Sequence, residues 1–290
     1  MSNSLHHIRI VLVEPAGALN IGSIARVMKN MGLSQLVVVN PQCEVNGEEA
    51  TRMSVHAIDL LQSAKIVPDL PTALAGCVRV IATTARERAI PTLLETPRQA
   101  LPWLVESNEP TALIFGREDS GLTNAELNYA TRYLRIPVGS EYSSLNLAQA
   151  VGVCAYELQV CASDIGLEPQ DIRSLAQRRK SLLFETLRER EGFANDSEET
   201  SELCASRQTA SRLQIPPQLD IAPVELVEGY YQQLETLLLE IGYLLPHTAA
   251  HRMEKIRRLY NRSQLSPNEV ALLRGILRQV SWAIDPKSSK

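Results

Sequence analysis

Three polar, glycine-containing segments are the places where this chain could do chemistry. Each follows or overlaps the end of a short apolar run of β type, and they are TTARER at Thr83–Arg88, FGREDSGL at Phe115–Leu122 and IPVGSEYSSLNLA at Ile136–Ala148. In an open parallel sheet, ligands bind outside the carboxyl ends of the strands. We therefore expect the three segments to converge on one pocket at a sheet edge.

The familiar signatures of nucleotide and metal chemistry are missing from the sequence. There is no GxxxxGK[ST] loop and no GxGxxG after the first strand, and GREDSG at Gly116–Gly121 lacks the lysine of a phosphate-binding loop. The five cysteines lie far apart without CxxC spacing, and the five histidines show no metal-ligand spacing. An ordinary nucleoside triphosphatase is disfavoured, and we predict neither a metal site nor a disulfide framework.

No export signal or membrane segment is evident. The first residues have no long apolar stretch with a cleavage-site pattern, and no run approaches the roughly 20 apolar residues of a membrane span. Cysteines without a pairing pattern fit a reducing compartment. We therefore expect a soluble, cytoplasmic protein.

Strands and helices alternate in the first half of the chain. Short apolar runs rich in β-branched residues are typical of strands buried on both faces, and they lie at Ile8–Val13, Leu36–Asn40, Val78–Thr83, Ala112–Phe115 and Tyr133–Pro137. After the first run, apolar residues at helical spacing predict a helix that Asn20 caps and Gly32 ends. Thr123 and Glu126 have the spacing of a capping box. The alternation predicts an α/β fold with a parallel sheet covered on both faces.

Composition divides the chain into three expected parts. We expect an α/β domain over residues 1–164, a polar linker over 165–222, and two or three amphipathic helices in a small domain over 223–290. From Pro246 to the end, nine Lys and Arg stand against three Asp and Glu, although the formal net charge of the whole chain is −4. Such asymmetry is typical of a module that binds a polyanion, and a plain solvated helix face is the alternative.

Three motifs, in this order and spacing, resemble those of the SPOUT-class (SpoU-type) RNA 2′-O-methyltransferases. They are NIGSIAR at Asn20–Arg26, FGREDSGL at Phe115–Leu122 and IPVGSEYSSLNLA at Ile136–Ala148, and the similarity runs from about Ile8 to Cys161. Further motifs resemble the TrmJ-like branch of tRNA ribose methyltransferases, namely TxARxR at Thr83–Arg88, KIRRLYNR at Lys255–Arg262 and LLRGIL at Leu272–Leu277. The linker carries no motif of the family.

The resemblance implies a trefoil-knotted methyltransferase domain followed by a basic helical domain that binds tRNA. It implies S-adenosylmethionine as methyl donor, a homodimer whose active sites can take residues from both subunits, and 2′-O-methylation of cytidine or uridine at position 32 of the anticodon loop. It also accounts for the small polar residues that lead directly into the helix after Ser144, because they let the backbone approach the cofactor. The alternatives are a ribose methyltransferase for ribosomal RNA or another tRNA position, and a non-catalytic RNA-binding protein of the same fold.

The resemblance also assigns roles to individual residues. Arg26 would hold the phosphate beside the ribose and favour the alkoxide. Ser144 would orient the ribose or the cofactor, Asn146 would hydrogen-bond Arg26, and Glu118 would steady the motif loops through backbone N–H groups. The residues expected at the cofactor are Thr83, Thr84, Ala85, Gly116, Ile136, Ser143, Ser144 and Leu145, and those expected at the RNA are Asn20, Arg26, Arg86 and Arg88.

Each of these roles has a plainer alternative. Arg26 could be a solvated helix residue, Ser144 a helix N-cap, and Asn146 a residue of the first helical turn. Glu118 could be an exposed loop carboxylate, and Gly116 a turn glycine.

Overall fold

The computed structural model describes six stretches of the chain, residues 5–85, 94–107, 109–139, 144–165, 221–261 and 263–284. By their contacts, Met1–Ala162 and Asp220–Lys290 belong to one compact unit and Ser163–Leu219 to a second. Most of the expected linker, together with Arg86, Arg88 and Ser143, lies outside the described residues. Within the described stretches, no helix is long and apolar enough to cross a membrane.

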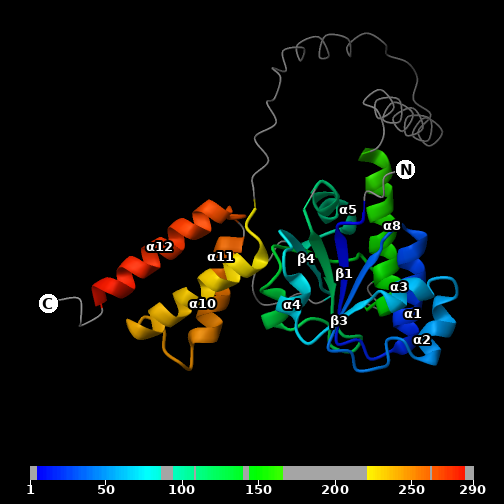
Figure 1. The fold of residues 1–290 in the computed structure, drawn as a ribbon, viewed down its shortest axis with the longest axis horizontal. Coiled ribbons are helices and arrows are strands. Elements are labelled where there is room, and N and C mark those ends of the chain that lie inside the picture. Colours follow the sequence, from blue (N-terminus) through cyan, green and yellow to red (C-terminus); the bar gives the residue numbers. More distant parts are fainter. Residues whose placement is uncertain are drawn as a thin grey trace, which may run out of the picture. The chain divides into compact units, whose positions relative to one another are not determined.

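A seven-stranded sheet with the strand order β3-β2-β1-β6-β4-β7-β5 forms the centre of the first half of the chain (Figure 1). All neighbouring pairs are parallel. The strands are β1 (Ile8–Val13), β2 (Gln35–Val39), β3 (Lys65–Val67), β4 (Arg79–Thr83), β5 (Leu94–Glu95), β6 (Thr111–Phe115) and β7 (Arg132–Leu134). The predicted parallel α/β fold is confirmed, and all five predicted strands are present.

Two strands, β3 and β5, were not evident in the sequence pattern. They are the two edge strands of the sheet, three and two residues long. No residue of either strand is fully buried, so neither carries the apolar run by which the central strands are recognised.

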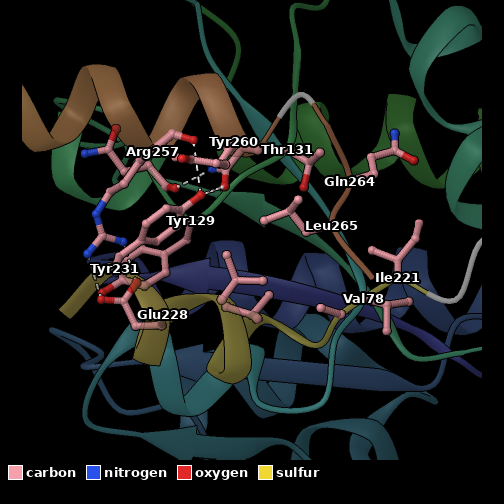
Figure 2. A pocket seen from close by; sticks show the side chains of 15 residues that line it. Val78, Tyr129, Thr131, Ile221, Glu228, Tyr231, Arg257, Tyr260, Gln264 and Leu265 are labelled. Carbon is pink, nitrogen blue, oxygen red and sulfur yellow. Dashed lines mark hydrogen bonds and ion pairs between the residues drawn. The ribbon is translucent and has the colours of Figure 1, made fainter. Parts of the chain in front are cut away.

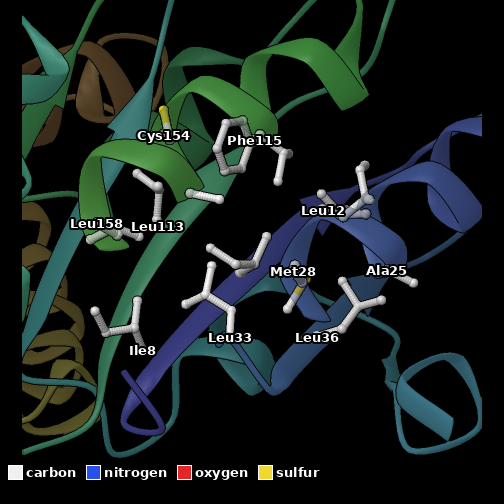
Figure 3. Packing of buried hydrophobic residues seen from close by; sticks show 14 of the residues in the cluster. Ile8, Leu12, Ala25, Met28, Leu33, Leu36, Leu113, Phe115, Cys154 and Leu158 are labelled. Atoms are coloured by element: carbon white, nitrogen blue, oxygen red, sulfur yellow. The ribbon is translucent and has the colours of Figure 1, made fainter. Parts of the chain in front are cut away.

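Alternate side chains of the strands enter two separate cores. Ile8, Ile10 and Leu12 of β1 join one cluster, and Val11 and Val13 join the other. The first cluster is closed by α1 (Ala18–Asn30), α2 (Glu48–Ser54), α3 (Ile58–Gln62), α5 (Pro97–Ala100), α6 (Pro102–Val105) and α8 (Leu147–Ile165), and part of it is drawn in Figure 3. The second cluster lies under α4 (Leu70–Leu74) and α7 (Asn124–Leu127). Burial on both faces is why the strands are apolar nearly throughout.

Two of the three predicted helix ends are confirmed and one is wrong. Thr123 and Glu126 form the expected capping box of α7, and Gly32 follows the end of α1 with a φ of 71°. The N-cap of α1 is Gly17, so Asn20 is not the cap but lies inside the first turn. The side chain of Asn20 forms hydrogen bonds with Glu118 and Asn146, which are distant in sequence, and therefore does not cap the helix as its spacing predicts.

Two or three helices were predicted for the C-terminal part of the chain, and the described residues form three. They are α10 (Val224–Glu240), α11 (Ala249–Asn261) and α12 (Pro267–Ile284). They share a core of their own around the buried Tyr230, Tyr231, Leu244, Met253 and Val270. The amphipathic stripes of these helices are thus satisfied mainly by one another.

Candidate active site

A cleft with a volume of about 250 Å³ lies at the carboxyl ends of three neighbouring strands. The strands are β4, β6 and β7, which end at Thr83, Phe115 and Leu134, and residues after each of them line the cleft. The three polar segments therefore converge as predicted. This follows from the parallel sheet, because β6, β4 and β7 are neighbours and present their carboxyl ends at the same edge.

Nearly all the residues expected at a cofactor line this cleft. The set comprises Thr83, Thr84, Ala85, Gly116, Ile136, Ser144 and Leu145. Ser143 lies outside the described residues, as do Arg86 and Arg88. Convergence from three separate loops supports the assignment, and direct participation in binding stays a prediction.

Gly116 is required by the tight turn that forms one wall of the cleft. A Cβ added at this position would lie 2.3 Å from the carbonyl carbon of Gly121 and 2.4 Å from the nitrogen of Leu122. Gly121 has a φ of 69°, and its N–H donates to the carbonyl of Arg117 at 3.0 Å. The two glycines therefore let the loop fold back on itself at van der Waals distance.

A chain of hydrogen bonds joins the three family motifs beside the cleft. The carboxylate of Glu118 accepts from the N–H groups of Ala16 at 3.0 Å and Gly17 at 3.1 Å, and from Nδ2 of Asn20 at 3.0 Å. Oδ1 of Asn20 in turn accepts from Nδ2 of Asn146 at 2.9 Å. The predicted contact of Glu118 with backbone N–H groups is confirmed.

The ionisation of Glu118 favours this network. Burial raises the pKa of its carboxyl, but hydrogen bonds from Asn20, Ala16 and Gly17 outweigh burial, and the pKa lies below its ordinary value. At neutral pH the group is a charged acceptor for three donors. It ties the loop after β6 to the start of α1.

Asn146 has a different partner from the expected one and caps the helix that follows. Its Oδ1 accepts from the N–H of Ala148 at 2.9 Å and of Gln149 at 3.4 Å, at the start of α8. Asn146 is therefore the residue that caps α8, and the alternative that made Ser144 the cap is wrong. The side-chain amide of Asn146 bonds Asn20, and among the described residues no hydrogen bond joins it to Arg26.

Arg26 lies outside the cleft of its own chain. It is exposed on α1, and its guanidinium has no hydrogen bond or ion pair with the part of the chain that the structure describes. Leu19, seven residues earlier on the same side of the helix, is 42% exposed. Among the described residues, the one cationic side chain in the cleft wall is Arg117, which was not among the predicted site residues; it forms an ion pair with Glu14.

A second cavity, of about 50 Å³, lies where α10 and α11 meet the segments before β4 and β7 (Figure 2). Its polar side chains bond to one another: Arg257 forms an ion pair with Glu228, and the Tyr231 hydroxyl donates to Oδ1 of Asn261 at 2.7 Å. Nδ2 of Asn261 donates to the carbonyl of Asn128 at 3.1 Å. The cavity has room for a few water molecules and is too small for a nucleoside. We therefore interpret it as a gap in the packing and not as a ligand site.

No cluster of three or more His, Cys, Asp or Glu that could hold a metal ion occurs among the described residues. The cleft is lined by apolar residues, by hydroxyl residues of the strand ends and loops, by the acidic Glu118 and Asp119, and by Arg117, which is paired with Glu14. This lining is suited to an organic ligand that combines a flat apolar part with a positive charge.

Comparisons with known proteins define the class. The model of the SpoU rRNA Methylase family matches residues 7–156, and that of the TrmJ C-terminal domain of tRNA methyltransferases matches residues 225–289. A tRNA (cytidine/uridine/adenosine-2′-O-)-methyltransferase TrmJ of Pseudomonas aeruginosa is 39% identical over 95% of this chain and 94% of its own length. The TrmJ of Sodalis glossinidius is 36% identical over 98% of this chain and 95% of its own.

A solved structure agrees with the sequence relatives. The crystal structure of TrmJ from Z. mobilis ZM4 superposes with a TM-score of 0.70 at 28% identity, covering 94% of this chain and 98% of that one. The chain belongs to the SpoU methylases and, within them, to the TrmJ family of tRNA 2′-O-methyltransferases.

S-adenosylmethionine is the cofactor that this methylase family implies, and the cleft fits it. Phe115, Leu134 and Ile136 offer apolar walls to an adenine ring, and Thr83, Thr84 and Ala85 line the cleft beside them. Glu118 and Asp119 supply negative charge on a side where a sulfonium cation would be favoured.

Proposed function

We propose that this protein transfers a methyl group from S-adenosylmethionine to the 2′-hydroxyl of cytidine or uridine at position 32 of tRNA. The observation that carries the proposal is the convergence of three motif loops on one cleft, with the Glu118–Asn20–Asn146 chain joining them. The printed names of the relatives, tRNA (cytidine/uridine-2′-O-)-methyltransferase, support tRNA ribose as substrate. Position 32 rests on the resemblance to the TrmJ branch.

S-adenosylmethionine supplies an electrophilic methyl group. The residues of the chain must hold the ribose hydroxyl in line with it and favour loss of the hydroxyl proton as charge develops. Arg26, whose guanidinium has no carboxylate partner in the described part of the chain, would bind the adjacent phosphate and stabilise the alkoxide. Ser144, exposed at the cleft, would orient the ribose, while Asn20 and Asn146 keep the loops in register.

A homodimer would bring Arg26 to an active site. Helices α1 and α8 lie side by side, since a Cβ on Gly152 would be 4.0 Å from Val27. Together they expose Leu19 at 42%, Val153 at 39% and Tyr156 at 55%. We infer that this apolar surface packs against a second copy, so that Arg26 serves the cleft of the partner. Val153→Asp should yield monomers in light scattering and lose methyl transfer; an active monomer would contradict the inference.

The three-part organisation, with a methyltransferase domain over 1–164, a linker over 165–222 and an RNA-binding domain over 223–290, is part of the proposal. We propose as well that the sheet carries the trefoil knot of the SPOUT class and that the protein acts in the cytoplasm. The parallel sheet and its helices support the first, and the tRNA substrate supports the second.

Only some basic residues of the C-terminal helices are available to RNA. Arg257 is paired with Glu228 and lies 4.6 Å from the ring centre of Tyr231. Lys255 and Arg278 are exposed, and no hydrogen bond or ion pair involves them in the described part of the chain. We therefore assign the phosphate contacts to Lys255 and Arg278 rather than to Arg257.

The salt dependence of tRNA binding tests this assignment. Replacing Lys255 and Arg278 by Ala should weaken binding and lower the slope of log K against log salt by about 1 to 2, because each phosphate contact contributes roughly 0.7–0.9. Arg98→Ala, which removes a charge from the exposed α5 residue paired with Glu157, is the matched control. An unchanged slope in the double variant would rule out these two contacts.

The decisive test is transfer of a labelled methyl group to tRNA that lacks ribose methylation, with nuclease digestion to locate the label. We expect one 2′-O-methyl nucleotide at position 32, and no transfer by Arg26→Ala although it still binds the cofactor. Label at another tRNA position, or only in ribosomal RNA, would agree with the proposed 2′-O-methyl transfer but contradict the proposed substrate. Absence of both transfer and cofactor binding would favour a non-catalytic RNA-binding protein.

A further inference from the structure

Glu14 and Arg117 form an ion pair that ties the end of β1 to the wall of the cleft. The two residues are 103 positions apart in the chain, and their side chains are 25% and 31% exposed. Arg117 lines the cleft, whereas Glu14 is not among the lining residues. Arg117 belongs to the motif Phe115–Leu122, but neither Arg117 nor Glu14 is among the residues to which the resemblance assigns a role.

The backbone at this site is held in an unfavourable conformation. Glu14 has a φ of 47°, and Asn40, at the end of the neighbouring strand β2, has a φ of 42°. Asparagine tolerates this region, but it is uncommon for glutamate and persists where the surroundings enforce it. Here the N–H of Glu14 donates to the carbonyl of Val39 at 2.8 Å, and Nδ2 of Asn40 donates to Oε1 of Glu14 at 3.1 Å. The structure thus maintains a strained residue whose carboxylate is directed at Arg117.

The ion pair between Glu14 and Arg117 changes the charge that the cleft wall presents to a ligand. Glu118 and Asp119 both place negative charge in the cleft wall, and the pKa of Asp119 is lowered chiefly by its hydrogen bond with Ser120 and also by Arg117. Arg117 adds a positive charge to the same wall, and the carboxylate of Glu14 pairs with it. Without Glu14, a cleft that must accept a sulfonium cation would have one more positive charge in its wall that no ion pair offsets. The methyl donor carries that cation, and the product S-adenosylhomocysteine has a neutral sulfide in its place. An unpaired guanidinium would therefore favour the product over the donor.

We propose that Glu14 neutralises Arg117 and thereby sets the preference of the cleft between the cationic methyl donor and its neutral product. In this role Glu14 is a positioning residue that acts through Arg117. The inference rests on the proposed function, because it takes the cleft as the S-adenosylmethionine site. It explains why a strained glutamate is kept at the carboxyl end of β1.

The test is the ratio of dissociation constants for S-adenosylmethionine and S-adenosylhomocysteine, measured by calorimetry on the full-length protein. Glu14→Gln keeps the shape of the side chain and an oxygen for Asn40, and it should raise the donor-to-product ratio of dissociation constants about threefold to tenfold, the order expected of one uncompensated charge at a pocket wall. Arg117→Met leaves Glu14 unpaired and should lower the ratio by a similar factor. The double variant should return close to the wild-type ratio.

Opposite signs in the two single variants separate an electrostatic role from a merely structural one. Loss of loop structure would weaken both ligands together and leave the ratio unchanged. Arg117→Lys, which keeps the charge, should hold the wild-type ratio, and Glu157→Gln, which breaks the remote ion pair with Arg98, is the matched control. Equal ratios in all variants, or shifts of the same sign in Glu14→Gln and Arg117→Met, would overturn the inference. Failure of the wild-type protein to bind either ligand would instead overturn the proposed function.

Discussion

Replacing Glu118 by Gln tests whether one carboxylate holds the motif loops together. In the native protein the carboxylate accepts from Ala16 N, Gly17 N and Asn20 Nδ2. The amide of Gln has the same shape but one accepting oxygen, so two donors can share that oxygen and the third faces an NH₂ group. Hydrogen bonds to charged groups contribute about 1.5–3 kcal/mol and neutral ones about 0.5–1.5 kcal/mol.

For a fully buried site, replacing three bonds to a charged acceptor by two to a neutral one would cost about 3.5–6 kcal/mol. Because Glu118 is only partly buried, solvent screening reduces the expected destabilisation to about 1–2 kcal/mol. For a protein of this size that corresponds to a fall in melting temperature of about 2–3 °C. Asp119→Asn removes the neighbouring carboxylate, which bonds Ser120 within the same loop, and should shift the melting temperature less.

The effect should depend on pH with a defined sign. Since the folded pKa of Glu118 lies below the unfolded value of about 4.3, its stabilising effect is complete above that value and is lost as the pH falls through the folded pKa. Thermal melts of the wild type and the Glu118→Gln variant should differ fully at pH 7.5 and converge in acid. Equal melting temperatures at pH 7.5, or a difference that is constant down to pH 3, would refute the role given to this carboxylate.

The remaining predictions concern two glycine substitutions and the reactivity of one buried cysteine. Gly22→Ala should destabilise the protein by about 1–3 kcal/mol in chemical unfolding, because a Cβ there would lie 2.3 Å from the carbonyl oxygen of Ala50 and force α1 away from α2. Gly275→Ala, in open space on α12, should stabilise by up to about 1 kcal/mol, and the opposite order would contradict the packing. Burial raises the pKa of the Cys154 thiol to about 12, so iodoacetamide at pH 8 should modify it only after unfolding, and mass spectrometry of the native protein would detect any exception.

Features coded by neighbouring residues were predictable from the sequence. The five strands with apolar runs, the capping box of Thr123 and Glu126, and the three C-terminal helices follow from periodicity and short spacings. The cleft was predictable as well, because parallel strands present the loops after them at a common edge, and the polar segments mark which loops those are.

The partners of the polar side chains could not be predicted in this way. Spacing made Asn20 a helix cap, whereas the fold bonds it to Glu118 and Asn146, which are 98 and 126 positions away. Asn146 caps α8 and bonds Asn20, which local spacing did not indicate, and its expected bond to Arg26 stays a prediction. Such bonds depend on which strands become neighbours, and no local pattern encodes that.

The sequence by itself determined the fold class, the motif loops and the family of this protein, because strand burial and motif spacing are properties of contiguous residues. Only the tertiary structure decided that Arg26 lies outside the cleft of its own chain and that Glu14 is paired with Arg117. The physical reason is that β1 and β6 are adjacent in the sheet although about a hundred residues separate their ends, so charges at those ends meet only when the sheet is assembled.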